Sequence, residues 1–159
     1  MATYNVVIGR AEFIDVIDTV PAVPAKIDTG AYRSSIHCSS IKEVEKNGSK
    51  VLKFELLGHP CSPVKYEMET SEYETVSVTN SFGKEEKRFE IRLRIKLGPK
   101  VVTTSFTLAD RSNNFFPVLI GRKLLKDRFL VDSSKSSVDR VKLKKEFGIS
   151  TPMDEEDME

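Results

Sequence analysis

Several residue types that would mark a particular class of protein are scarce or absent in this chain. It has no Trp and only two Cys and two His among 159 residues. Two cysteines are too few for a small secreted fold held by disulfides, so we expect Cys38 and Cys61 to be free thiols. No apolar run approaches the roughly 20 residues that span a bilayer. The first five residues lack the basic and apolar segments of a signal peptide. These absences predict a cytoplasmic protein with no membrane partner.

The chain also lacks an excess of charge of either sign. Its formal net charge is +1, which indicates no nucleic-acid partner. Hydrophobic residues make up 39% and charged residues 31%, a balance typical of one soluble globular domain. The composition changes after Asp132. We therefore expect one domain over residues 1–132, followed over residues 133–159 by a polar linker, a basic helix near 138–147 and a disordered acidic tail at 153–159.

What the sequence does contain is a series of short strand patterns. The clearest lies at 88–97, where apolar residues alternate with Glu90, Arg92, Arg94 and Lys96 and predict one buried and one basic, solvated face. Further strands are predicted over residues 6–8, 13–17, 51–57, 75–79, 101–108, 117–120 and 129–132. Prolines predict an interruption at 20–24 and a loop at 58–71, and helix formers predict a short helix within 122–128. Many short strands with Gly and Pro turns favour an all-β barrel or sandwich.

One turn carries residues suited to acid–base chemistry. A predicted strand delivers Asp28 into a tight turn, with Thr29 and Gly30 directly after it. Two carboxylates that face each other across a water can share a proton, because both cannot ionise cheaply at such range. One carboxylate then acts as base on the water while the other donates a proton to a peptide carbonyl. Gly30 would let the backbone approach a substrate, and Thr29 could hold the turn across such a pair. Asp, Thr and Gly are also common turn residues, so an ordinary turn remains an alternative at this point.

A second motif, Val118-Leu119-Ile120-Gly121-Arg122, follows downstream. Together, the D-T-G-A turn at 28–31 and this apolar-Gly-Arg segment resemble the retropepsin pattern. The longer segments 25–37, 107–112 and 129–132 resemble, within that group, a microbial family often named "ATP-dependent zinc protease", which is linked with ATP-grasp enzymes that ligate glutamate onto proteins. The resemblance covers roughly residues 5–132.

The resemblance implies a fold, an activity and an assembly. The fold would be a closed, retropepsin-like all-β barrel with a short helix after the V-L-I-G-R strand. The activity would be that of an aspartic endopeptidase with Asp28, Thr29 and Gly30 as the catalytic turn. Asp132 and Asp110 are not followed by glycine, so one chain supplies one carboxylate. A homodimer with two-fold symmetry would bring Asp28 beside its copy, and a monomer is expected to be inactive.

Retropepsins also cover their substrate with a hairpin flap. The best candidate in this chain is the hairpin at 76–91, with residues 81–84 at its tip. We expect Phe82 and Gly83 to contact substrate there. An ordinary surface hairpin is the alternative.

Further substrate contacts are expected beside the catalytic turn, from Ala31, Arg33 and Ile120. Many retropepsins carry an acidic residue soon after D-T-G-A, whereas this chain has Tyr32 and Arg33. That difference favours acidic substrates, such as glutamate-rich protein tails. It also removes the usual acidic partner of Arg122.

Zinc and ATP, which the family's name mentions, have no matching motif. The sequence holds neither H-E-x-x-H nor a phosphate-binding loop, so we expect no cofactor and no metal. His37 and Cys38 are adjacent, and adjacent strand residues point to opposite faces. We therefore expect buried cysteines and a hydrogen-bonded His37, and a salt bridge or turn at Asp110-Arg111. Two other functions stay open: a catalytically inactive dimerisation or binding module of retropepsin-like fold, and zinc hydrolysis through the cluster of His37, Cys38, His59 and Cys61.

Overall fold

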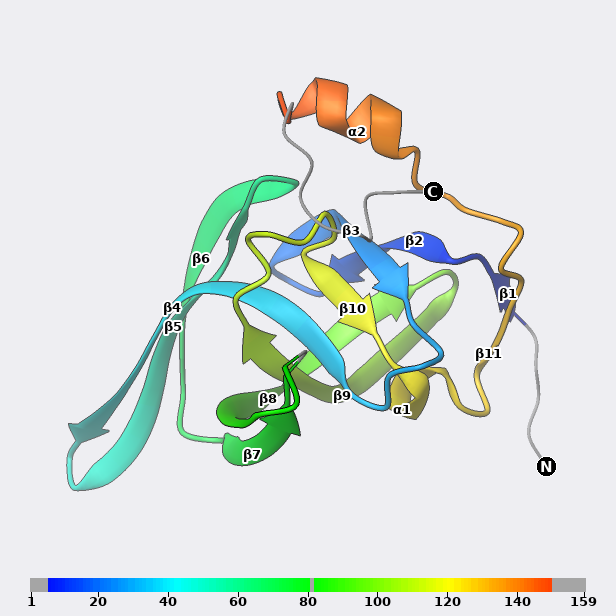
Figure 1. The fold of residues 1–159 in the computed structure, drawn as a ribbon. Helices are drawn as coiled ribbons and strands as arrows, with labels where there is room; N and C mark the ends of the chain where they lie inside the picture. The colour runs from blue at the N-terminus through cyan, green and yellow to red at the C-terminus, as the bar shows by residue number, and fades with distance from the viewer. Residues whose placement is uncertain (1–5, 81, 150–159) are drawn as a thin grey trace.

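The computed structural model describes residues 6–80 and 82–149, and shows a mostly β fold (Figure 1). Ser81 of the predicted flap tip and the predicted acidic tail at 153–159 lie outside these residues. The strands are β1 (Val6–Ile8), β2 (Ala11–Val16), β3 (Val20–Ile27), β4 (Ser34–Lys46), β5 (Ser49–His59), β6 (Ser62–Thr70), β7 (Glu74–Thr79), β8 (Glu85–Leu97), β9 (Lys100–Ala109), β10 (Val118–Ile120) and β11 (Phe129–Val131). The helices are α1 (Arg122–Leu125) and α2 (Arg140–Glu146). No described helix has the length and apolar character needed to cross a membrane.

Six strands close into a barrel, which confirms the predicted fold class. They follow the order β10-β3-β2-β8-β9-β4, and β10 then pairs with β4 to close the ring. From Ile91 onward β8 behaves as its alternation predicts, because Ile91, Leu93 and Ile95 are buried in the core while Arg92 and Arg94 are exposed. Glu90, which was expected on the solvated face, is buried, with 9% of its surface exposed. The short α1 follows β10 directly, as expected.

The prediction of a loop at 58–71 is wrong. β6 occupies most of that segment and pairs along β5, from Leu52↔Thr70 to His59↔Ser62. β4, β5 and β6 form a twisted sheet that projects from the barrel (Figure 1). Tyr66 and Met68 pack against the core from β6. Pro63 is tolerated because β6 ends the sheet, where a missing N–H costs least.

The predicted interruption at 20–24 is also wrong, because β3 runs through both of its prolines. Pro24 lies opposite Phe13 on β2. On its other edge β3 pairs with β10 only from Ala25 to Ile27. Pro24 therefore lies just outside the part of β3 that has strands on both sides.

The segment after Asp132 runs along the barrel. The carbonyl of Lys135 accepts a hydrogen bond from the Arg10 N–H (2.8 Å), and the Ser137 N–H donates to the Ala11 carbonyl (2.9 Å). This part of the predicted linker is thus fixed against the start of β2.

The basic helix expected near 138–147 is present as α2. Its first turn is capped by the Asp139 side chain, which accepts a hydrogen bond from the Lys142 N–H. Val138 and Leu143 join Phe115 and Phe116 in a second hydrophobic cluster outside the barrel core. α2 is therefore held by apolar packing as well as by its cap.

Candidate active site

The Asp28 turn begins where β3 ends. The Asp28 N–H donates to the Ile120 carbonyl (2.8 Å), and its Oδ1 accepts a hydrogen bond from the Gly30 N–H (2.9 Å). A Cβ on residue 30 would lie only 3.2 Å from that Oδ1, so glycine permits this close approach. Asp28 is partly buried, whereas Thr29 and Gly30 are exposed. The turn thus fixes one carboxylate at the surface.

The second motif packs against this turn. β10 pairs in parallel with β3 over Ala25–Ile27, and the Arg122 N–H donates to the Ala31 carbonyl (2.8 Å). A Cβ on Gly121 would lie 2.5 Å from the Arg33 carbonyl oxygen, so no larger residue fits there without movement. The two segments that carry the resemblance, far apart in sequence, therefore form one interlocked unit.

Arg122 has partners other than the acidic residue that the sequence lacks. Its Nη1 donates to the Thr29 carbonyl (3.1 Å), and its guanidinium carbon lies 5.9 Å from the centre of the Tyr32 ring. A carbonyl and an aromatic face can both stabilise a guanidinium. Arg122 thus supports the Asp28 turn directly.

Arg33 pairs with a residue that the sequence analysis missed. Its Nη1 lies 2.8 Å from Oε2 of Glu90 on β8. The Arg33 side chain is 40% exposed and that of Glu90 is 10% exposed. The alternation of β8 places Glu90 on the polar face, but no local signal in the sequence links that position to residue 33.

Ile120 and Ala31, which were also expected to contact substrate, differ in how deeply they are buried. The Ile120 side chain is fully buried, so in this chain Ile120 supports the Asp28 turn through its carbonyl. Ala31 is partly buried beside that turn.

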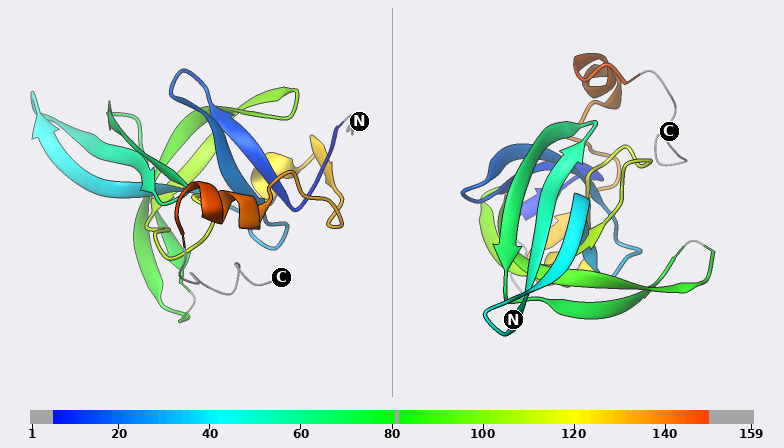
Figure 2. Two further views of the ribbon diagram at one scale, coloured as in Figure 1. Left: turned by 90° about the horizontal axis from the view of Figure 1, so that it is seen from above. Right: turned by 90° about the vertical axis from the view of Figure 1, so that its left-hand side faces the viewer.

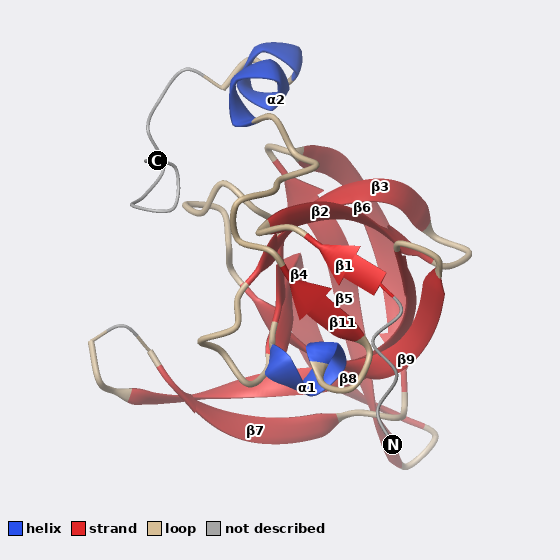
Figure 3. Ribbon diagram, turned by 90° about the vertical axis from the view of Figure 1, so that its right-hand side faces the viewer, coloured by secondary structure: helices blue, strands red, loops and turns tan. Residues whose placement is uncertain are grey.

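The hairpin expected at 76–91 is present as β7 and β8, and it projects from the barrel (Figure 2, right; Figure 3). At its tip the Asn80 Oδ1 accepts hydrogen bonds from the N–H groups of Phe82 and Lys84. Gly83 has a φ of +78°, which favours glycine, and Phe82 is 88% exposed. A flap role for this hairpin stays a prediction.

Residues 7–142 match the family described as the RimB-like, retropepsin-like aspartic endopeptidases. The chain belongs to this family. This assignment agrees with the barrel and with the two interlocked motifs, and it confirms the resemblance seen in the sequence.

Relatives of this RimB-like chain include much longer proteins named probable alpha-L-glutamate ligase. The protein from Desulfotalea psychrophila is 33% identical over 71% of this chain and 25% of its own length. The one from Shewanella pealeana is 32% identical over 74% of this chain and 26% of its own length. The chain thus spans about a quarter of the curated relatives that it matches. A solved structure of a Legionella pneumophila protein of unknown function has a TM-score of 0.66 and 33% identity, over 83% of this chain and 96% of that one.

The two histidines of the RimB-like chain are buried and hydrogen-bonded. His37 Nδ1 accepts from the Arg111 N–H (2.9 Å), and His59 Nδ1 accepts from the Cys61 N–H (2.9 Å). His59 Nε2 lies 2.8 Å from the Asn114 carbonyl oxygen, to which it donates. Burial lowers the pKa of His37 and lowers the pKa of His59 to about 4. Both rings are therefore neutral parts of the framework at neutral pH.

Both cysteines are buried thiols outside any disulfide, as expected. Burial raises the pKa of the Cys38 thiol to about 11, which makes it a poor nucleophile. Within residues 6–80 and 82–149, no group of three or more His, Cys, Asp or Glu side chains is placed to hold a metal ion. Asp110 forms the expected turn, since its Oδ1 accepts hydrogen bonds from the N–H and hydroxyl of Ser112.

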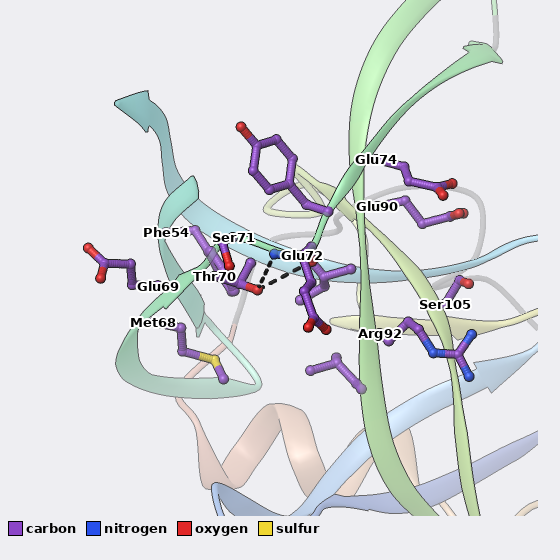
Figure 4. A pocket seen from close by; sticks show the side chains of 13 residues that line it. Phe54, Met68, Glu69, Thr70, Ser71, Glu72, Glu74, Glu90, Arg92 and Ser105 are labelled. Carbon is purple, nitrogen blue, oxygen red and sulfur yellow. Dashed lines mark hydrogen bonds between the residues drawn. The ribbon is translucent and has the colours of Figure 1, made fainter. Parts of the chain in front are cut away.

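A groove lies apart from the catalytic turn, between the β5–β6 hairpin and the start of β7 (Figure 4). Its lining combines apolar side chains such as Phe54 and Met68 with carboxylates, which are those of Glu69, Glu72, Glu74 and Glu90. Of the described residues that line it, none belongs to the Asp28 turn. This groove is therefore not the candidate active site.

Proposed function

We propose that this RimB-like chain is an aspartic endopeptidase that works as a homodimer and uses Asp28 from each chain. The observation that carries the proposal is the Asp28 turn itself. The turn holds Oδ1 through the Gly30 N–H, and Oδ2 has no hydrogen-bond partner among the described residues. One carboxylate edge is thus fixed, and the other can accept a water or face a second carboxylate.

An apolar surface beside the turn supports the dimer. Thr29 and Tyr32 border a depression whose lining includes Leu125, Phe129 and Leu130. Tyr32 is 55% exposed and Leu130 is 48% exposed, so two large side chains of this depression present apolar surface to solvent. A second copy related by a two-fold axis beside Thr29 would cover this surface. The same axis would bring the two Asp28 carboxylates together.

In such a dimer the two carboxylates would share one proton, because two like charges at short range cannot both ionise cheaply. The ionised carboxylate would take a proton from the water as it attacks the peptide carbonyl carbon. The protonated carboxylate would donate to the carbonyl oxygen. Collapse of the resulting tetrahedral species then breaks the C–N bond, and the amine leaves with a proton. The pair titrates as a unit, so acid and base are roles of the pair.

Acidic protein segments, such as glutamate-rich tails, are the proposed substrates. Arg33 lies close after the catalytic turn and offers a partly exposed guanidinium. The relatives' names, probable alpha-L-glutamate ligase, support a link with glutamate chemistry. The two buried thiols, neither of them in a disulfide, support a reducing, cytoplasmic setting.

The test is cleavage of a peptide library that includes glutamate-rich sequences, with products read by mass spectrometry. The wild-type chain should cleave, the Asp28→Asn variant should not, and a chelator should have no effect. Cleavage that persists in Asp28→Asn would overturn the aspartic mechanism, and cleavage lost to a chelator would favour a zinc hydrolase. A wild-type chain that binds these peptides but cleaves none would favour the inactive binding module.

Oligomeric state is measured separately. Analytical ultracentrifugation under conditions of cleavage should show a dimer. A protein that is only monomeric while active would contradict the shared-carboxylate site.

A further inference from the structure

A row of buried polar side chains crosses three barrel strands beside the catalytic turn. Ser35 on β4 lies opposite Thr107 on β9, and Thr107 lies opposite Glu90 on β8. Their exposed fractions are 8%, 2% and 9%. The neighbouring residues Ile36 and Phe106 are buried in the barrel core. Because side chains alternate across a strand, the polar row faces away from that core. Because these side chains are buried although they face away from the core, other parts of the chain must cover them.

Arg33 reaches one end of this row. It immediately precedes β4, and its Nη1 contacts Glu90 Oε2 at 2.8 Å, across β9. A guanidinium carries five N–H donors in a rigid fork. Glu90 engages one edge of that fork, and 40% of the Arg33 side chain remains exposed. A buried carboxylate thus holds a guanidinium whose remaining donors can face a ligand.

The Arg33–Glu90 ion pair connects the segment after the Asp28 turn with the projecting β7–β8 hairpin. Arg33 follows the catalytic turn in sequence, and its carbonyl lies against Gly121 of the second motif. Glu90 is at the base of the projecting hairpin, where it pairs with Glu74 at the start of β7. Figure 4 shows Glu90 and Glu74 side by side at this base. Glu90 also lines the groove between the β5–β6 hairpin and β7, so the ion pair links that groove to Arg33 beside the Asp28 turn.

We propose that Glu90 is a positioning residue that holds Arg33 as a preformed receptor for a carboxylate side chain of the substrate. The inference rests on the proposed peptidase function and names its specificity residue and that residue's support. A guanidinium fixed in advance loses little freedom on binding, and it can pair with a carboxylate through two parallel hydrogen bonds.

Two roles of Glu90 predict opposite results. If Glu90 positions the guanidinium, then removing its carboxylate weakens recognition of an acidic side chain. If Glu90 only competes with substrate for Arg33, then its removal strengthens that recognition, because one negative charge fewer faces the ligand.

The experiment compares two peptides that differ by one Glu or Gln at the preferred position, and measures the ratio of their kcat/KM values. Arg33→Gln should lower the preference for Glu about tenfold or more, as expected for loss of a charged hydrogen bond. Glu90→Ala should lower it about three- to tenfold. A preference that is unchanged or raised in Glu90→Ala would overturn the proposal. Glu90→Gln keeps an acceptor oxygen and should fall between wild type and Glu90→Ala.

Glu69→Ala is the matched control. It removes a carboxylate from exposed ion pairs with Lys46 (3.2 Å) and Lys53 (3.7 Å) on the projecting sheet, and it should leave the preference unchanged. Thermal melting of each variant shows whether it is folded. If Glu90→Ala does not fold, Glu90→Gln takes its place, and an unchanged or raised preference there overturns the proposal.

A binding readout separates this inference from the proposed function. Fluorescence anisotropy of the same two peptides is measured on the Asp28→Asn variant, with and without Glu90→Ala. Tighter binding of the Glu peptide that weakens with Glu90→Ala supports the positioning role. Equal effects on both peptides contradict it. Failure of the wild-type chain to cleave either peptide would count against the peptidase, while this comparison would still decide the role of Glu90.

Discussion

Two regions of the molecule contain side chains capable of acid–base chemistry: the Asp28 turn, and the buried cluster of His37 and His59. They differ in how fully the fold supplies hydrogen bonds to those side chains. At the Asp28 turn, the Gly30 N–H holds one carboxylate oxygen, and the adjacent Thr29 and Gly30 are exposed. In the His37–His59 cluster, Nδ1 of each ring accepts a backbone N–H, and the rings meet edge to face at 5.2 Å. A reactive group needs an unfilled position for its substrate, whereas a structural group has its hydrogen bonds satisfied within the fold.

The largest test of this contrast removes the carboxylate. Asp28→Asn should lower kcat/KM for peptide cleavage by about a thousandfold or more, because an amide cannot act as the base. Its melting temperature and dimer mass should match those of the wild type. His59→Gln is the comparison variant. Assayed at a pH where it is folded, it should keep most of the activity, since both ring nitrogens of His59 are engaged by the backbone.

The buried cluster of His37 and His59 should instead affect how the free energy of unfolding depends on pH. The pKa of His59 is about 4 in the folded chain and 6.5 when unperturbed. Between these values the unfolded chain takes up a proton that the folded chain does not, so stability falls as pH drops from 6.5 toward 4. The loss attributable to His59 should reach about 3 kcal/mol.

Urea unfolding at several pH values measures that slope. His59→Gln should reduce the slope over this range without abolishing it, because His37 also has a lowered pKa. An identical slope in the variant would show that His59 is not the group responsible.

A substitution at Gly121 tests how tightly the V-L-I-G-R segment packs against the segment that follows the D-T-G-A turn. Gly121→Ala places a Cβ 2.5 Å from the Arg33 carbonyl oxygen. Overpacking of this kind should destabilise the fold by about 1–3 kcal/mol and displace the catalytic turn. Urea unfolding measures the loss, and the exposed Ser77→Ala should change stability by less than about 0.5 kcal/mol. Unchanged stability in Gly121→Ala would mean that the two segments separate easily.

The smallest expected effect concerns the dimer surface. Leu130→Ala should weaken dimerisation by about tenfold while the monomer stays folded. Sedimentation equilibrium measures the dissociation constant. Val64→Ala is the matched control, because Val64 is 60% exposed on β6, in the sheet that projects from the barrel. Equal effects of the two variants would place the dimer contact elsewhere.

Much of the fold and the centre of the candidate site could be predicted from the sequence alone. The alternation in β8 sets one buried face, because strand side chains point to opposite sides. The D-T-G and V-L-I-G-R segments are short sequence patterns, so their residues could be named before the structure was known. The close approach at Gly30 is local to its turn, whereas the one at Gly121 is to the Arg33 carbonyl and depends on the fold.

Other features were decided only by tertiary contacts. β6 has weak alternation, Pro63 at its second position and Pro60 in the turn before it, and it is a strand because β5 supplies a partner. β3 tolerates Pro24 because of where β10 begins to pair. The pairing of Arg33 with Glu90 joins the residue before β4 to one on β8 through the barrel's register. Sequence patterns report a residue's own backbone and its near neighbours, whereas these contacts depend on which distant strand the closed barrel places beside them.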